Sequence, residues 1–234
     1  MLAEALRALR RGVPVLLHDS SGREDEVDYV VPAGVVDADT VYEMRVLAGG
    51  LICYAMAREV ASVLGLRFAS EYYSAFPELR PLLKTPGYGE PPAFSIWVNR
   101  VGVATGIRDA DRAETIRGLH EVSLAALGGR EGEARRMFQE GFMAPGHVPI
   151  LVERGLEKRR GHTELALALA RLAGVPPSMA LAEMLARGRQ LSVDEALRVS
   201  REYGYPLVEG SEVIEAWRSS RGRRQPPPSP SAPA

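Results

Sequence analysis

The chain alternates between short apolar runs and longer segments in which apolar residues recur every three or four positions. The runs predict strands at 13–18, 28–36, 51–55 and 94–98, and a turn leading into a strand at 145–152. The longer spacing predicts helices at 2–10, 37–47, 58–64, 109–127, 159–174, 178–187, 192–203 and 211–218, and residues 128–136 form a turn or a short helix. Asp109 or Asp111 is the predicted N-cap of helix 109–127.

Strands and helices follow one another irregularly, which predicts a mixed α/β (α+β) fold. We expect a single domain with a mixed, twisted central sheet covered by helices on both faces. The domain should span 1–218, and the Arg-, Pro- and Ser-rich tail at 219–234 should be disordered. Residues 66–92 carry five prolines and no clean period. Such a long irregular segment is usually functional or disordered, and its tyrosines and glycines suit a lid.

Composition excludes several classes of protein. The 234 residues are 46% hydrophobic and 25% charged, which is ordinary for one large domain. A net charge of −1 gives no global field for nucleic acid, and no apolar run approaches the roughly 20 residues that span a bilayer. The N-terminus lacks the features of a signal peptide, and the single cysteine, Cys53, excludes an intrachain disulfide. We therefore expect a cytoplasmic protein with no nucleic-acid or membrane partner.

Residues 19–28 place five carboxylates and one arginine between two predicted strands. If 24–28 is extended, Glu24, Glu26 and Asp28 share one face. Like charges so close together need a compensating cation or proton. Carboxylate oxygens suit a hard cation, Mg²⁺ or Mn²⁺. The alternative is a solvated acidic turn.

Residues 159–164 combine two arginines and a glycine directly before a predicted helix. Arg159 offers guanidinium donors, and Gly161 and Thr163 add free backbone N–H groups and a hydroxyl, which together suit a phosphate. The imidazole of His162 is available as a metal ligand or base, although a histidine at a helix start equally serves as a cap or packing residue.

Three other places carry candidate chemistry. His147 follows Pro145 and Gly146 on a predicted turn, where packing alone gives it little to do. The polar stretch 105–112 is a second candidate anion site, or else the capped start of a surface helix. Glu183 lies inside an apolar segment, so it either meets an arginine or hydroxyl or works as an acid or base. Cys53 sits in an apolar strand and is typical of a small core residue.

Taken together, these stretches resemble the 3,4-dihydroxy-2-butanone 4-phosphate synthase family of riboflavin biosynthesis. The resemblance covers about residues 10–205 and rests on motifs in the family's order. They are Arg23-Glu24-Asp25-Glu26 with Asp28, Gly50-Leu51-Ile52-Cys53, Thr105-Gly106-Ile107 with Asp111-Arg112-Ala113 and Thr115-Ile116, Pro145-Gly146-His147-Val148, Arg159 with Gly161-His162-Thr163-Glu164, and Ala173-Gly174 with Glu183. The chain departs from the family pattern at Val27, Gly34, Arg160 and Ala182.

The resemblance implies an enzyme, a lyase that converts D-ribulose 5-phosphate to L-3,4-dihydroxy-2-butanone 4-phosphate and formate with Mg²⁺, or with Mn²⁺ as the alternative. It implies that the protein is a homodimer with active sites near the interface. The implied metal ligands are Glu24 and His162, and the implied catalytic groups are His147, Glu183, Glu26 and Asp28. The implied substrate-binding residues are Arg23, Glu24, Asp28, Thr105, Asp111, Arg159, Gly161, His162, Thr163 and Glu183.

Two competing hypotheses remain. The first is a catalytically weak homologue that binds a phosphosugar as a regulatory or binding protein. The second is a relative of the same broad fold that acts on nucleotides or tRNA. The carboxylates and histidines of every motif are present, which opposes the first hypothesis. The near-zero net charge and the lack of a basic, aromatic-rich face oppose the second.

Overall fold

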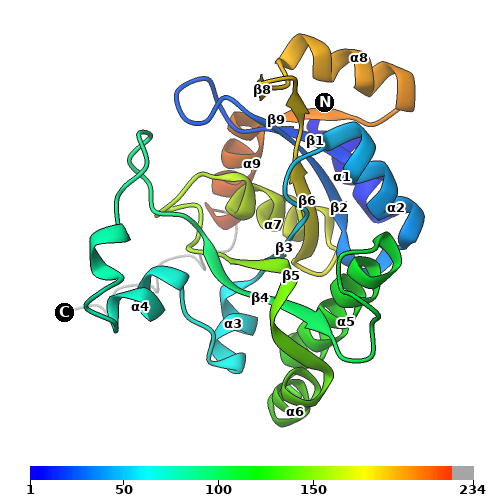
Figure 1. Cartoon of the computed structure of the whole chain (residues 1–234). Coiled ribbons are helices and arrows are strands. Elements are labelled where there is room, and N and C mark those ends of the chain that lie inside the picture. The colour runs from blue at the N-terminus through cyan, green and yellow to red at the C-terminus, as the bar shows by residue number, and fades with distance from the viewer. Residues whose placement is uncertain (223–234) are drawn as a thin grey trace, which may run out of the picture.

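The computed structural model describes residues 1–222. A seven-stranded mixed sheet runs through the molecule, with helices on both of its faces (Figure 1). The predicted mixed α/β fold is therefore confirmed. The last helix, α9, continues to Gly222, so it includes the first four residues of the predicted tail, and the rest of that tail lies outside the described residues. No helix within 1–222 is both long enough and apolar enough to cross a membrane.

The strand order of the sheet is β4-β5-β3-β6-β2-β1-β9. Its strands are β1 Val15–His18, β2 Val27–Pro32, β3 Cys53–Met56, β4 Phe94–Arg100, β5 Phe142–Val152, β6 Ser178–Glu183 and β9 Leu207–Glu209. The pairs β3–β5 and β1–β9 are parallel and the other pairs are antiparallel. The short strands β7 (Leu185–Ala186) and β8 (Arg189–Gln190) form a separate hairpin. Strand β6 thus joins two segments, β2 and β3, that precede it by more than a hundred residues.

Each face of the sheet has its own hydrophobic core. Side chains on one face pack against helices α2 Ala38–Glu43, α3 Arg58–Leu64, α5 Asp109–Leu127, α6 Glu131–Gly141 and α8 Val193–Tyr203. Those on the other face pack against helices α1 Leu2–Arg10, α7 His162–Ala173 and α9 Gly210–Gly222. Because successive side chains of a strand point to opposite faces, each inner strand contributes alternate residues to the two cores.

Local sequence explains where several helices begin and end. Asp37 caps α2 by accepting the N–H of Thr40 at 2.8 Å, and Ser192 caps α8 in the same way. Helix α7 ends at Gly174, whose left-handed φ of +74° favours glycine. In 66–92 the structure contains α4 (Ala69–Ser74) and a 3₁₀ turn at Arg80–Leu82. The helix predicted from Asp109 does run to Leu127, but Arg108 is its N-cap residue.

The predicted helix 178–187 is wrong, because residues 178–183 form strand β6. The sequence Ser-Met-Ala-Leu-Ala-Glu has the composition of a helix. Strand β6 lies between β2 and β3 and is covered on both faces, so its side chains are apolar on both sides. A strand buried in this way loses the polar–apolar alternation by which strands are recognised.

The predicted turn at 145–147 is also wrong. Strand β5 begins at Phe142, so His147 lies inside it, next to register shifts in the β4–β5 pairing. Gly146 packs so closely on the backbone of Val98 that a Cβ atom would overlap it. A glycine, a proline and an irregular ladder make this part of the strand resemble a turn in sequence.

Candidate active site

Four separate segments meet at one end of the sheet on the face covered by α7. They are the loop before β2, the end of β6, the start of α7 and the residues before β4 (Figure 1). The cavity between them is lined by Glu24, Glu26, Asp28, Tyr88, Pro92, Ala93, Phe94, Leu151, Arg159, His162, Thr163, Leu181 and Glu183. Its open volume is about 100 Å³, less than the roughly 300–1,000 Å³ of typical ligand pockets. A larger cavity, near 650 Å³, lies away from these residues, between α7 and α9.

Strand pairing brings two of the predicted catalytic carboxylates together. Asp28 on β2 pairs directly with Glu183 on β6. Both residues share the strand face that packs against α7. Glu183 Oε2 accepts the N–H of Leu51 at 2.8 Å, and Gly50 leaves room for it, because a Cβ there would overlap the glutamate. Of the two alternatives for Glu183, a contact with an arginine or hydroxyl is not found within residues 1–222, and the role of acid or base stays a prediction.

The acidic loop is not extended as predicted. Asp25 has a left-handed φ of +55°, and strand β2 begins only at Val27. The buried carboxylate of Asp19 sets this shape by accepting the backbone N–H groups of Glu24 and Glu26, each at 3.1 Å. Glu24 and Glu26 nevertheless line the cavity. Glu24, Glu26 and Asp28 therefore line the same cavity, but a turn held by Asp19 brings them there and not an extended strand.

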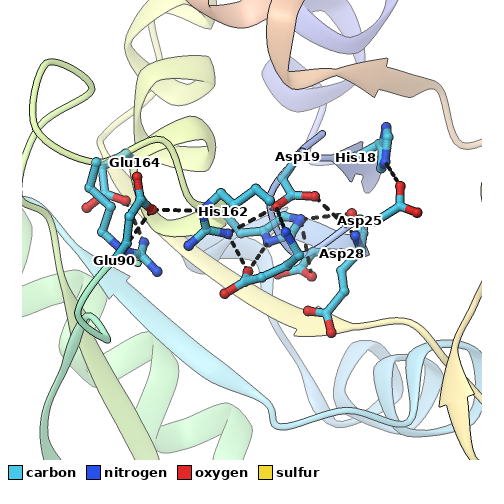
Figure 2. Close-up of polar contacts among 11 residues, drawn as sticks. His18, Asp19, Asp25, Asp28, Glu90, His162 and Glu164 are labelled. Carbon is cyan, nitrogen blue, oxygen red and sulfur yellow. Dashed lines mark hydrogen bonds and ion pairs between the residues drawn. The ribbon is translucent and has the colours of Figure 1, made fainter. Parts of the chain in front are cut away.

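The imidazole of His162 lies at the centre of the carboxylates (Figure 2). Its Nε2 lies 3.1 Å from the backbone oxygen of Glu26 and therefore donates, while Nδ1 lies 3.7 Å from Glu24 Oε2. Burial alone would lower the pKa of His162, but the charges of Asp28 and Glu24 raise it to about 9. Because Nε2 donates to the backbone of Glu26, Nδ1 faces Glu24, and it can bind a metal once its proton is released.

Asp28 is the least satisfied carboxylate of the site. It is 1% exposed, and its Oδ1 has no hydrogen-bond partner among residues 1–222. Burial and repulsion from Glu183 and Glu26 raise the pKa of Asp28 to about 8. A buried oxygen without a partner is costly, so this atom calls for a proton, a cation or a ligand hydroxyl.

The residues present fit a divalent cation. Oxygen or nitrogen atoms of Asp19, Glu24 and His162 lie within 4.8 Å of one another. Asp19 is already engaged by two backbone N–H groups and by Arg23, so Glu24 and His162 are the better placed ligands. Despite burial, His162 and Arg23 lower the pKa of Glu24 to about 2, so this carboxylate is ionised and able to bind a cation.

Two arginines stand beside this cluster. Arg23 donates to Asp19 at 3.0 Å, forms a short ion pair with Glu24 and stacks on the ring of Tyr88. Arg159 forms a buried ion pair with Glu164, with Nη1 2.7 Å from Oε2. Both guanidinium groups lie where a side chain at Gly161 would be. The glycine therefore opens the start of α7 to an anion that both arginines can reach.

Three predicted site residues lie elsewhere. His147 contacts Asn99, Thr105 contacts Asp111, and none of the three lines the cavity in the part of the chain that the structure describes. The exposed His147 donates its backbone N–H to the side-chain oxygen of Asn99 at 2.8 Å. Asp111 accepts the N–H groups of Thr105 and Gly106, which gives it the structural role of holding the loop before α5.

Several residues of the site were not predicted. Asp19 belonged to the acidic run but had no assigned role, and Glu164 lay in the motif that suggested an anion site. Tyr88 and Glu90 come from the aperiodic segment 66–92, where no local pattern distinguishes them. None of the three departures at Val27, Gly34 and Arg160 lines the described cavity: Val27 is buried in β2, Gly34 leaves space for His120, and Arg160 is exposed.

The fold and the site define a class of protein: a mixed α/β protein with a carboxylate–imidazole cluster beside two arginines, suited to a small anionic ligand rich in oxygen. Comparison with known proteins agrees. The sequence profile of the family described as 3,4-dihydroxy-2-butanone 4-phosphate synthase matches residues 3–216. Proteins of that name from Archaeoglobus fulgidus and Methanosarcina mazei are each 38% identical, over alignments covering 93% and 91% of this chain and 94% and 89% of theirs.

A solved structure gives the same result. The 3,4-dihydroxy-2-butanone 4-phosphate synthase "in complex with two Magnesium ions" superposes with a TM-score of 0.74 at 25% identity, covering 94% of this chain and 98% of that one. The chain belongs to the 3,4-dihydroxy-2-butanone 4-phosphate synthase family. The resemblance read from the motifs is thereby confirmed.

Proposed function

We propose that the protein is a Mg²⁺-dependent lyase of riboflavin biosynthesis that converts D-ribulose 5-phosphate to L-3,4-dihydroxy-2-butanone 4-phosphate and formate. The observation that carries this proposal is the Glu24–His162 pair next to Arg23 and Arg159. The Glu24–His162 pair suits a cation, and the two arginines suit the phosphate group of the substrate. Family membership and the magnesium-bound relative support the same assignment.

In the proposed complex the residues divide the work by position. Arg159, Gly161 and Thr163 bind the phosphate at the start of α7, and Arg23 orients the acidic loop. Glu24 and His162 hold the metal, which supplies Lewis acidity toward the ketone and hydroxyl oxygens of the sugar.

The remaining groups contact the carbon skeleton. Asp28, whose buried Oδ1 has no hydrogen-bond partner within residues 1–222, contacts a substrate hydroxyl. Glu26 and Glu183 line the same cavity as Asp28 and exchange protons with the sugar. Mn²⁺ suits the same ligands and replaces Mg²⁺.

We further propose a homodimer in which a second copy completes the site. His147 is exposed on β5 and contacts Asn99, against which Gly106, the neighbour of Thr105, also packs; His147, Thr105 and Asp111 are not among the residues that line the described cavity. A catalytic role for His147 and a substrate-binding role for Thr105 and Asp111 therefore require a partner's cavity. A cytoplasmic location stays a prediction.

The test is formate production from ribulose 5-phosphate. We expect formate with Mg²⁺ or Mn²⁺, none after EDTA treatment, and none from His162→Ala or Glu24→Gln. Glu140→Gln, an exposed carboxylate on α6, is the matched control and should keep full activity. Folded, metal-loaded protein that makes no formate would refute the proposal and favour a phosphosugar-binding protein. Activity that survives EDTA would refute the metal assignment.

A further inference from the structure

Glu90 occupies a place between the two arginines of the site. Its Oε2 accepts a hydrogen bond from Arg23 Nε at 2.8 Å and lies 3.9 Å from Arg159 Nε. Figure 2 shows Glu90 and Glu164 on the same side of the cluster. Glu90 comes from the segment before β4, far in sequence from either arginine. One carboxylate thus faces both cations that the start of α7 presents.

Both arginines have more donors than acceptors around them. The buried Arg23 Nη2 and Arg159 Nε have no hydrogen-bond partner anywhere in residues 1–222. Arg23 Nη2 would lie 2.7 Å from a Cβ atom at Gly161, and the Arg159 guanidinium would overlap that atom. A single carboxylate leaves these N–H groups unsatisfied, whereas a phosphate has more acceptor oxygens and more charge. The arginine pair is therefore better matched to a phosphate than to Glu90.

We propose that Glu90 is an internal competitor for the phosphate subsite: it holds 86–92 over the cavity in the free protein, and a bound phosphate displaces it. The inference rests on the proposed function in taking a phosphosugar as the ligand. Displacement of 86–92 would enlarge the cavity, whose open volume of about 100 Å³ is small for a phosphosugar and which Tyr88 and Pro92 help to line. The neighbouring Gly89, with φ +82°, and Tyr88, stacked on Arg23, belong to the same covering segment.

The arginines keep their positions when Glu90 leaves. Arg23 remains bound to Asp19 and Glu24, and Arg159 remains bound to Glu164. Loss of the Glu90 contact therefore costs the subsite little order, and the released charges become available to the ligand. Neutralising Glu90 should accordingly strengthen phosphate binding rather than weaken it.

The test compares Glu90→Gln with Glu78→Gln, an exposed glutamate in the same long segment. Binding of inorganic phosphate to the full-length protein is measured by calorimetry, with Mg²⁺ present throughout. We expect Glu90→Gln to bind about tenfold more tightly, which corresponds to about 1.4 kcal/mol, and Glu78→Gln to match the wild type. Unchanged or weaker binding by Glu90→Gln would overturn the proposal.

Hydrogen exchange of 86–92 provides an independent readout. Phosphate should speed exchange in the wild type, and exchange in Glu90→Gln should already be fast without it; slower exchange on phosphate addition would contradict displacement. Neither measurement needs turnover. If the protein makes no formate but shows the tighter phosphate binding and the faster exchange, only the proposed reaction is refuted. If it makes formate but shows neither effect, only the role of Glu90 is refuted.

Discussion

The buried ion pair between Arg159 and Glu164 allows a quantitative test of how the site is built into the fold. Arg159→Met removes the cation but keeps a side chain of similar length. Glu164 is fully buried, and without Arg159 it retains one hydrogen bond, from the backbone N–H of Arg154 at 2.9 Å. The substitution therefore leaves a buried carboxylate without its ion-pair partner.

The expected loss of stability follows from that burial. Breaking a buried pair by removing one partner costs about 3–5 kcal/mol. For a domain of this size that corresponds to a fall in Tm of roughly 6–20 °C. Glu164→Gln alone is also destabilising, because it leaves Arg159 unpaired. Combining Arg159→Met with Glu164→Gln removes both charges, and the amide oxygen still accepts the Arg154 N–H, so the double variant should recover most of the loss.

The loss should also depend on pH. Burial raises the pKa of Glu164, and Arg159 counteracts that rise, so the pKa is higher still in Arg159→Met. A carboxyl group with a raised folded-state pKa favours folding at low pH, and this contribution fades as pH rises from the unfolded value of about 4.3 through the folded one. The gap between wild type and Arg159→Met should therefore be smaller at pH 5 than at pH 8.

Urea denaturation followed by circular dichroism measures all four proteins at both pH values. The reasoning predicts a strong positive coupling between the two substitutions. Two outcomes would refute it: a cost below about 1 kcal/mol for Arg159→Met, or single effects that simply add in the double variant. The first would show that solvent reaches Glu164, and the second would show that the pair makes no net interaction.

Three further substitutions test other parts of the structure. Gly161→Ala places a methyl group against the two guanidinium groups and should weaken phosphate binding at least tenfold by calorimetry; because it pushes Arg159 away from Glu164, it should also lower urea stability, by less than Arg159→Met does. Gly146→Ala overlaps the backbone of Val98 and should cost several kcal/mol or prevent folding, as shown by circular dichroism. Burial alone would lower the pKa of His18, but Glu209 raises it. The stability advantage of the wild type over His18→Gln should therefore be present below about pH 6.5 and shrink as pH rises. A difference in stability that grows with pH would exclude this ion pair.

Local signals in the sequence predicted the elements that local interactions determine. The boundaries of α3 and the cap of α8 at Ser192 agree with the pattern because spacing and capping act within a few residues. Strand β6 was assigned as a helix because its environment comes from β2 and β3, which a window around 178–183 does not contain.

The candidate site likewise combines parts that local sequence predicts with parts that it does not. The acidic run and the start of α7 each pointed to their chemistry, since the relevant residues are adjacent in sequence. The pairing of Asp28 with Glu183 depends on strand register across the sheet, and Glu90 reaches Arg23 from an aperiodic segment. Such contacts arise only when distant segments pack together, so no local pattern encodes them.

The position of β6 between β2 and β3 has a consequence for folding during synthesis. The β1–β2 hairpin pairs residues close in sequence and can form as soon as both strands have been made. Asp28 acquires its neighbour Glu183 only after 155 further residues, the difference between the two positions, have been added. At bacterial or eukaryotic elongation rates that takes roughly 10–30 s. During that interval β2 presents an open hydrogen-bonding edge, a period in which the nascent chain is vulnerable to pairing with other strands.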